Sequence, residues 1–581
     1  MKKFIVIILI LGLIIFGVSY FYILKPPPVK MLSAEILPNN TLFMVEIVDL
    51  EKSIESVKAS KLGQELGKID IPKVMRELEA PPETIRNLKE KMDDFEEIIN
   101  SVFFKELFGR DVTIAVLPVH FDPLEQLTKD KFLSSIVLIS HPKRRTEIIE
   151  FLSRVFAKKL DYKTSTYATY EIKSFELATD ITVHSTFTDD LLLAALDLNS
   201  LKRCIDIKMN QQPPLSKNNN YQYFQRKLAS TKINSHVYIN IKMFIDNIRN
   251  LLVVLGPFTR ERYKIDKFED VINVYKGFNG IGLSLYEEGK DILAQKSLML
   301  IDKSKIDPLY AKVYDIKPEM NRSIKMIPVN SALYYWTNAF DPSSSKDMLL
   351  KDPRVDEEKL NLIEDELKKL GTSIEELSGA LGNQYGLIMT DVITTFFFPL
   401  PKIALFIEVK DQAMVENLIF SLVQNQGMAM QQEIYEGVDI KNIMLPIKQD
   451  IQPSYAFFNG FYIFAINPQQ IKDMIDAYKS GNNITSDADF QAVNKGLIGN
   501  NNMISFAKFG FLIDKMGGLF EMAKMSSMAT QDQAAIERSN IIADEVFKPL
   551  LEGLKVCSAV GTRLVYRDKE IEIDSYYRIV E

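Results

Sequence analysis

The feature that most constrains this chain is an internal repeat that runs through nearly all of its 581 residues. Short segments of the first half return in the second half in the same order, which indicates a repeated structural unit. The matching segments are 37–43 with 327–333, 107–109 with 380–382, 136–139 with 403–406, 189–206 with 459–476, and 224–246 with 490–514. We therefore predict two tandem domains, residues 36–325 and residues 326–581.

The match between residues 189–206 and 459–476 is the firmest, because it aligns without a gap. Four positions carry the same residue in both copies: Ala195 and Ala465, Lys202 and Lys472, Ile205 and Ile475, and Asp206 and Asp476. We expect the two segments to form the same secondary-structure elements, each in its own copy.

The apolar pattern within each copy predicts an α+β fold. Alternation such as Leu283 and Leu285 is typical of half-buried antiparallel strands. Apolar residues at three- and four-residue spacing, such as Ile471 and Ile475, predict helices that cover one face of a sheet. Each copy is predicted to be a mainly antiparallel sheet covered by helices. The expected order is a strand, a helical insert, two strands, a helix, three strands, two short helices, a strand, a helix and a hairpin.

The first 25 residues predict a single membrane-spanning helix. Lys2 and Lys3 precede an uncharged apolar run from Phe4 to Leu24, and Lys25 follows it. As a helix rising about 1.5 Å per residue, this run spans roughly 31 Å, close to the hydrocarbon thickness of a bilayer. The lysines in front favour a cytoplasmic N-terminus. We expect residues 1–25 to anchor the chain and everything after them to lie outside the cytoplasm, in the periplasm or its equivalent.

A cleaved signal peptide is the alternative for this segment, since Gly17, Val18 and Ser19 form a small-residue cleavage pattern. The apolar run continues five residues beyond that pattern, which favours the anchor. Residues 26–35 begin with three prolines and are predicted to be a stiff linker between the membrane and the first domain.

Three short motifs resemble a family of membrane-anchored bacterial envelope proteins labelled as a domain of unknown function. They are Leu37-Pro38 with Thr41 at the start of a strand, the helical segment from Ser60 to Leu66, and Leu107-Phe108-Gly109 before a strand. The resemblance covers residues 34–300 and returns more weakly in the second copy. It implies the placement and the fold described above, and it implies no catalytic residues.

Charge and cysteine content exclude several classes of protein. The net charge of -7 is spread along the chain, so nucleic acid is not an expected partner. The two cysteines, Cys204 and Cys557, lie far apart and in no metal-binding spacing, and each is interpreted as an apolar core residue.

The four histidines, His120, His141, His184 and His236, occur only in the first copy, at scattered positions that predict edge or surface sites. We expect no bound metal and no cofactor.

One pair of motifs partly matches the pattern of serine acyl-transferases that act on cell walls. Ser343 to Lys346 fits Ser-x-x-Lys, and Lys479-Ser480-Gly481 resembles the later motif of the same enzymes. The intervening Ser-x-Asn motif is absent, and Gly481 is expected to cap the end of a helix. The sequence therefore does not predict an enzyme.

The strongest candidate for a contact site is the apolar connection Phe396, Phe397, Phe398 and Leu400. The equivalent stretch of the first copy, residues 121–133, is polar, so the fold does not require apolar residues there. Exposed apolar clusters of this kind mark partner or membrane contacts, whereas cover by helices of the other copy, the first, is the alternative. The methionine cluster Met516, Met522, Met525 and Met528 is a further candidate for an adaptable apolar surface, with a helix packed loosely on the sheet as the alternative.

Together these observations favour a non-enzymatic, membrane-anchored envelope protein that binds a protein, glycan or lipid partner outside the cytoplasm. A carrier or chaperone for lipid or other apolar cargo is the first alternative. An envelope hydrolase of unrecognised type is the second.

Overall fold

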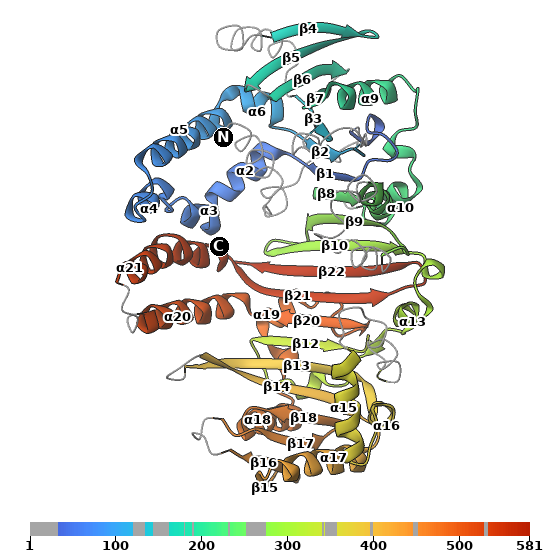
Figure 1. The fold of residues 1–581 in the computed structure, drawn as a ribbon, viewed down its shortest axis with the longest axis vertical. Helices are drawn as coiled ribbons and strands as arrows, with labels where there is room; N and C mark the ends of the chain where they lie inside the picture. Colours follow the sequence, from blue (N-terminus) through green and yellow to red (C-terminus); the bar gives the residue numbers. More distant parts are fainter. Residues whose placement is uncertain are drawn as a thin grey trace. The chain divides into compact units, whose positions relative to one another are not determined.

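The computed structural model describes residues 33–119, 134–142, 162–178, 181–188, 191–229, 233–250, 275–339, 342, 357–394, 399–445, 451–527 and 533–580. The predicted anchor, residues 1–25, lies outside them. The chain divides into two compact units (Figure 1). Unit 1 comprises Met1–Ile301 and Ser527–Gly553, and unit 2 comprises Asp302–Ser526 and Leu554–Val580. The predicted domain ranges 36–325 and 326–581 stay predictions.

Unit 1 is built on an antiparallel sheet whose strands follow the order β4-β5-β6-β7-β3-β2-β1-β8-β9-β10. A helical insert joins β1 to β2, so these two strands are adjacent in the middle of the sheet although they are distant in sequence. The strands are β1 (Phe43–Ile47), β2 (Val112–Val116), β3 (Ile136–Ser140), β4 (Tyr162–Tyr167), β5 (Tyr170–Ala178), β6 (Ile181–Thr188), β7 (Leu191–Ala195), β8 (Ile233–Ile239), β9 (Phe278–Glu287) and β10 (Ile292–Ile301).

Unit 2 repeats this strand order with its own strands: β15-β16-β17-β18-β14-β13-β12-β20-β21-β22, again antiparallel throughout. The strands are β12 (Leu333–Thr337), β13 (Leu381–Thr394), β14 (Pro399–Val409), β15 (Ala429–Tyr435), β16 (Val438–Met444), β17 (Ser454–Phe458), β18 (Phe461–Ala465), β20 (Met503–Ala507), β21 (Cys557–Tyr566) and β22 (Glu570–Ile579). A small ladder pairs β11 (Glu319–Met320) with β19 (Asn500–Asn501). The predicted α+β class is confirmed, and each unit contains a mainly antiparallel sheet.

The expected strand count was wrong at one place in each unit. Three strands were predicted before the paired short helices, whereas the described chain has four, β4 to β7 and β15 to β18. The outermost strands are exposed and polar, so they lack the apolar alternation that predicts a strand from sequence. β4, for example, consists of Tyr-Lys-Thr-Ser-Thr-Tyr.

One face of each sheet is covered by a helix, a 3-10 turn and a second helix. In unit 1 these are α9 (Leu198–Lys208), η2 (Leu215–Lys217) and α10 (Asn219–Lys227), and in unit 2 they are α18 (Pro468–Ser480), η7 (Ile484–Ser486) and α19 (Ala488–Val493). The first helix begins at an Asp197 cap in unit 1 and at an Asn467 cap in unit 2, where the side chain accepts a backbone hydrogen bond. Gly481 ends α18 with a left-handed backbone at φ 74°, as predicted.

Further helices of unit 1 lie before β1, in the insert between β1 and β2, or in the C-terminal part of the chain. They are η1 (Ser33–Glu35), α2 (Leu50–Ala59), α3 (Lys61–Leu66), α4 (Ile71–Glu77), α5 (Pro82–Asn100), α6 (Val102–Phe108), α21 (Gln533–Ile542), the π-helix η8 (Ala543–Phe547) and α22 (Lys548–Leu554). Helices α4 and α21 pack together, and Lys73 of α4 binds Glu545 of η8 at 2.8 Å.

The other helices of unit 2 flank its sheet. They are η3 (Lys303–Lys305), α13 (Pro308–Ala311), η4 (Lys312–Asp315), η5 (Ile324–Met326), α15 (Glu357–Lys369), α16 (Ile374–Ala380), α17 (Gln412–Asn425) and α20 (Phe509–Ser527). A capping box formed by Ser373 and Glu376 fixes the start of α16.

The gapless match expected between residues 189–206 and 459–476 is confirmed at the level of secondary structure. Each segment forms a five-residue strand and then a helix, β7 with α9 and β18 with α18. Cys204 and Met474 occupy matching positions, and both are fully buried, as predicted for a small core residue.

The identical lysines and aspartates of this match perform the same task in both units. The Tyr167 hydroxyl donates to Asp206 at 2.9 Å, and the Tyr435 hydroxyl donates to Asp476 at 2.9 Å. Lys202 and Lys472 lie 4.9 and 5.3 Å from the centroids of those tyrosine rings. Each pair of contacts ties the tip of an edge hairpin to the first covering helix, so these residues serve the architecture.

We predict that Ile475→Ala lowers the free energy of unfolding of the full chain by about 2–5 kcal/mol. Ile475 is fully buried on α18, and its truncation leaves a cavity against the sheet. Urea unfolding measures the effect, with Gln469→Ala on the exposed side of the same helix as the control. A loss below about 1 kcal/mol for Ile475→Ala would contradict the packing of α18 described above.

Candidate functional site

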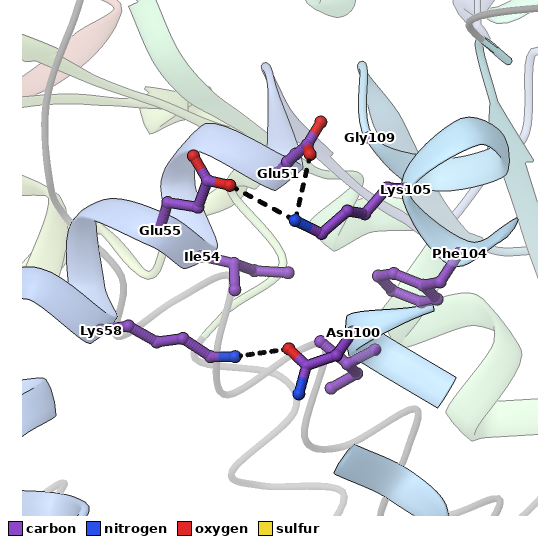
Figure 2. A pocket seen from close by; sticks show the side chains of 9 residues that line it. Glu51, Ile54, Glu55, Lys58, Asn100, Phe104, Lys105 and Gly109 are labelled. Atoms are coloured by element: carbon purple, nitrogen blue, oxygen red, sulfur yellow. Dashed lines mark hydrogen bonds and ion pairs between the residues drawn. The ribbon is translucent and has the colours of Figure 1, made fainter. Parts of the chain in front are cut away.

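A small pocket lies between helices α2 and α6 of unit 1 (Figure 2). Its cavity volume is about 30 Å³, room for one or two water molecules. The side chains of Ile54 and Phe104 point into it, and Glu51, Glu55, Lys58 and Lys105 line its rim. The full set of lining residues is Glu51, Ile54, Glu55, Lys58, Ile99, Asn100, Phe104, Lys105 and Gly109.

The charges of this pocket neutralise each other. Lys105 Nζ lies 3.4 Å from a carboxylate oxygen of Glu51 and 3.4 Å from one of Glu55. Hydrogen bonding to Glu51, and then to Glu55, raises the pKa of Lys105. Lys58 Nζ donates to the side-chain oxygen of Asn100 at 2.8 Å. The lining residues include no serine, cysteine or histidine, and the lysines and glutamates of the rim are engaged in the contacts just described.

A polar cluster beside the pocket caps helix α2. Asp49 has a left-handed backbone at φ 52° and accepts the Lys52 N–H at 3.3 Å, while its own N–H donates to Asp111 at 3.2 Å. His141 Nδ1 lies 4.0 Å from Asp111, and burial raises the pKa of the Asp111 carboxyl. These contacts fix the chain where β1 turns into α2, which is a structural role.

A buried carboxyl lies on β1, on the face covered by α9 and α10. Glu46 is fully buried, and both carboxyl oxygens lack a hydrogen-bond partner among the described residues. Its direct neighbours across the sheet are Thr113 and His236. Burial, followed by the charge of Asp111, raises the pKa of Glu46 to about 8. The carboxyl is therefore mainly neutral at pH 7.

His236, beside Glu46, corrects a prediction from the sequence. The histidines were expected at edges or on the surface, but His236 is buried on β8, a strand with neighbours on both sides. Its Nδ1 lies 2.7 Å from the Ser284 hydroxyl, and burial lowers its pKa to about 4. The polar neighbours Ser284 and Glu46 reduce the energetic cost of burying the imidazole ring of His236.

A second candidate site is a set of apolar side chains on one face of the unit 2 sheet, which we call the open face. It consists of Leu333, Tyr335, Leu387, Met389, Ile403, Leu405 and Phe464, all half-buried or exposed. Directly opposed residues join them into rows, because Tyr335 pairs with Leu387, Leu387 with Leu405, and Leu405 with Phe464. Leu405 is 51% exposed and Phe464 is 36% exposed.

The matching face of unit 1 is covered over β1 and β2, whereas Leu138 of β3, the counterpart of Leu405, is half-buried. There Val45 pairs with Ile114, and Ile114 pairs with Leu138. Val45 is 1% exposed and Ile114 is 2% exposed. Leu50 and Ile54 of α2 pack with Phe104 of α6 against Val45, Ile47 and Val112, and Leu138 packs against the same cluster. The two units therefore differ in solvent access at equivalent positions of equivalent strands.

The predicted contact residues Phe396, Phe397 and Phe398 lie outside the described residues. Leu400 is described and lies on β14, where it pairs with Ile393 of β13 and is partly buried. The hairpin that Phe396–Phe398 connects in sequence is the one that carries Leu387, Met389, Ile403 and Leu405 of the open face.

The residues of the two serine-enzyme motifs, the second cysteine and the methionine cluster are placed as follows. Ser343 to Lys346 lie outside the described residues, whereas Lys479 is exposed and binds Glu436 at 3.0 Å. Cys557 is half-buried at the start of β21, and burial raises its pKa to about 12. Met516 on α20 is 45% exposed.

Within the described ranges, no group of three or more histidine, cysteine, aspartate or glutamate side chains is arranged to hold a metal ion. Within the same ranges, no helix combines the length and apolarity that crossing a membrane requires.

We predict that the free energy of unfolding falls as the pH rises from about 6.5 to 8. The folded pKa of Glu46, about 8, exceeds its ordinary value of 4.5, so folding binds a proton that the unfolded chain has released. The stability that this proton provides is present at low pH and is lost as pH rises through the folded pKa. His236 acts in the opposite direction between pH 4 and 6.5, so its titration does not offset the Glu46 effect above that window.

Urea unfolding across this range should show a loss on the order of 2 kcal/mol for the natural chain. Glu46→Gln should remove most of the loss, because the amide does not titrate. Glu55→Gln, on the exposed side of α2, is the control and should leave the loss unchanged. An equal loss in Glu46→Gln and the natural chain would show that Glu46 is ionised in the fold.

Comparisons with known proteins give a family and a weak structural likeness. No curated protein matches the chain. The solved structure titled "Structure of crystal form I of TP0453", from Treponema, is similar to 49% of this chain and 86% of that chain, with 8% sequence identity and a TM-score of 0.24. A likeness of that size assigns neither fold nor role. The family model described as "Protein of unknown function (DUF3352)" matches residues 4–346 and 399–542, which is more than half of the sequence. The chain belongs to the DUF3352 family.

Proposed function

We propose that this chain is a non-enzymatic, membrane-anchored envelope protein that binds a partner through the open face of unit 2. The observation that carries the proposal is the exposure of Leu405 and Phe464 in a row of apolar side chains. Exposed contiguous apolar surface is costly in water, and proteins that retain it use it for contacts.

The internal repeat strengthens this interpretation. We infer that the two units arose from one duplicated α+β unit, since every strand pairing of one sheet has a counterpart in the other. The fold itself is compatible with a covered face, because α2 and α6 of unit 1 pack over Val45, and Ile114 beside it is buried. Exposure in unit 2 is therefore a property of that copy and not a requirement of the architecture.

The membrane part of the proposal rests on the sequence of the N-terminus. The uncharged run Phe4–Leu24 is long enough to cross a bilayer, and Lys2 and Lys3 favour a cytoplasmic start. Both units would then lie outside the cytoplasm, in the periplasm or its equivalent, where a partner could be a protein, a glycan or a lipid.

The non-enzymatic part rests on the α2–α6 pocket. Its two glutamates share the positive charge of Lys105, so neither is presented to a substrate as a free base. Its volume of about 30 Å³ is roughly a tenth of the smallest ordinary ligand pocket. These properties are typical of a small water-accessible gap between two packed helices, here α2 and α6, and not of a ligand-binding pocket.

Phe396, Phe397, Phe398 and Leu400 remain a proposed part of the contact. In sequence, residues 396–398 connect β13 and β14, the two strands that carry four of the seven residues of the open face, and Leu400 lies on β14. A carrier of apolar cargo would use the same surface, and lipid that co-purifies with the chain would favour that alternative.

We predict that protease added to intact spheroplasts degrades the chain, because residues 26–581 lie on the outer side of the membrane in this proposal. Immunoblotting with an antibody to unit 2 measures the loss, and a cytoplasmic protein serves as the control for lysis. Full protection in intact spheroplasts would refute the topology, and recovery in the soluble periplasmic fraction would refute the anchor.

We also predict that a photo-crosslinking amino acid at position 405 forms an adduct of higher mass in cells. Position 362 is the matched control, because Leu362 is 64% exposed and lies on α15, outside the open face. Leu405→Ser should change the free energy of unfolding by less than about 1 kcal/mol and should weaken recovery of the adduct partner. Equal crosslinking at positions 405 and 362, or none at 405, would contradict a binding role for the face.

A further inference from the structure

We propose that residues 33–36 form a proton-controlled latch on the sheet of unit 1. The latch is closed while the carboxyl group of Glu46 is neutral, and its opening releases the proton of that carboxyl. This inference goes beyond the proposed function, because it concerns unit 1 alone and makes no use of the open face.

The latch lies over the sheet beside Glu46. The Thr113 hydroxyl donates a hydrogen bond to Ser33 Oγ at 2.8 Å. Thr113 is also the direct neighbour of Glu46 across the β1–β2 ladder, so the two side chains point to the same face of the sheet. Ser33 is therefore bonded to the residue that lies next to Glu46 on β2.

Apolar burial provides most of the attachment of the latch. Ala34 and Ile36 are at most 1% exposed, and both belong to the apolar cluster on the face covered by α9 and α10. Among the described residues, one hydrogen bond joins the latch to other elements of unit 1, the bond from Thr113 to Ser33. A change that weakens the fit of this short segment can therefore release it without breaking the sheet.

Leu37 is the hinge of the latch. Its carbonyl accepts a hydrogen bond from the Leu215 N–H at 2.7 Å, and the Asn39 N–H donates to the Pro213 carbonyl at 3.1 Å. The side-chain amide of Asn218 also donates to Asn39 Oδ1, at 2.9 Å. These bonds hold the chain against η2 and the start of α10, so an opening that begins at residue 33 would stop at Leu37.

Ionisation of Glu46 provides the free energy that opens the latch. The carboxyl is fully buried, and both of its oxygens lack a hydrogen-bond partner among the described residues, so a charge there would be neither solvated nor paired. Burial raises the pKa of Glu46 from its ordinary value of 4.5 to about 8. In an open, solvated site the pKa would return to the ordinary value, so opening releases a proton at any pH between these two values.

The titratable groups around Glu46 in the described structure either oppose its ionisation or are uncharged. The charge of Asp111 on β2 raises the pKa of Glu46 further. His236, its neighbour on β8, has a pKa lowered by burial to about 4 and is neutral above pH 6. Burial raises the pKa of Tyr221 on α10 well above its ordinary value, so the phenol keeps its proton. The acid of η1, Glu35, is exposed.

The latch is the part of the cover that opens most easily. Helix α10 is held by Tyr221 and Phe224, whose rings pack on the ring of Tyr238 at centroid distances of 5.4 and 6.1 Å. Helix α9 carries the fully buried Cys204, where burial raises the thiol pKa to about 12. Both helices are longer than the three-residue η1, which has fewer contacts to lose.

Opening would lengthen the connection between unit 1 and the membrane. Residues 33–35 are the end of the predicted linker 26–35, and four residues released from the sheet extend by up to about 14 Å. This consequence rests on the anchor of the proposed function, whereas the latch itself does not. On the proposed topology, the latch responds to the pH outside the cytoplasm.

Cysteine labelling measures the opening directly. Ala34→Cys places a thiol at a fully buried position, and Glu35→Cys places one at an exposed position of the same segment. Each full-length variant is labelled with a maleimide in mild detergent between pH 6 and 8.5, and mass spectrometry of the labelled peptides gives the rates. Dividing the rate at position 34 by the rate at position 35 removes the pH dependence of the thiol chemistry. The ratio therefore reports the open fraction of the latch.

We expect this ratio to rise at least tenfold between pH 6 and 8 and to level off above pH 8, because opening releases a proton in that window. With Glu46→Gln the ratio should change less than about twofold over the same range, since the amide does not titrate. Thr113→Val removes the bond to Ser33, so it should raise the ratio at every pH and preserve the rise.

Three results would overturn the inference. A ratio that does not change with pH while Glu46 is present would do so without any further variant. An equal rise in Glu46→Gln would assign the effect to another group. Labelling of the natural Cys204 that rises in parallel with position 34 would show that unit 1 opens as a whole. None of these results bears on the proposed function, which is tested at position 405 of unit 2.

Discussion

The structure depends on one constraint of β-sheets: successive side chains point to opposite faces, so a sheet made of wholly apolar strands needs cover on both sides. Strands such as β14, with Ile403, Ala404, Leu405, Phe406 and Ile407 in succession, are of this kind. One face of each unit is closed by the helices that follow β7 and β18. The second face is closed in unit 1 by the α2–α6 insert. In unit 2 that face carries half-buried and exposed apolar side chains instead.

The two copies keep the same contacts at their edge hairpins, whereas their buried residues differ at equivalent positions of the central strands. Tyr167 with Asp206, and Tyr435 with Asp476, hold the edge hairpins in the same way in both units. By contrast, the β1 position of the buried Glu46 is taken in β12 by Trp336, whose indole N–H donates to Gln384 at 3.3 Å. The fold therefore accepts either a neutral acid or an indole at this position. The residues that differ between the copies are accordingly the better guide to what each copy does.

Much of the fold was predictable because repeated segments and apolar alternation are local signals. The match of residues 189–206 to 459–476, the buried Cys204 and the cap at Gly481 follow from neighbouring residues alone. The edge strand β4 was missed because its sequence, Tyr-Lys-Thr-Ser-Thr-Tyr, is mostly polar and its described side chains are mostly exposed. The burial of His236 was missed because its cover comes from strands and helices distant in sequence.

The open face could not be found from sequence, although a signal for it exists. The runs 403–407 and 461–465 are apolar without alternation, which indicates strands with both faces apolar. The sequence does not say whether both faces are covered, because that depends on the register that brings Tyr335, Leu387, Leu405 and Phe464 into one row. The open face becomes evident when the two sheets are compared. They have the same strand order, but among the described residues only the sheet of unit 1 has a helix such as α2, directly after the first strand, over this face.

The central claim is that Leu405 faces solvent in the free chain and a partner in the cell. The most direct measurement is the rate at which a Leu405→Cys variant reacts with a maleimide. The native cysteines provide the baseline, since Cys204 is fully buried and burial raises its pKa to about 12. The account predicts rapid labelling of position 405 in the purified chain, at least tenfold above that baseline, and slower labelling in intact cells. Labelling of the purified variant no faster than that of the natural chain would contradict it, because Leu405 would then be buried by the protein itself.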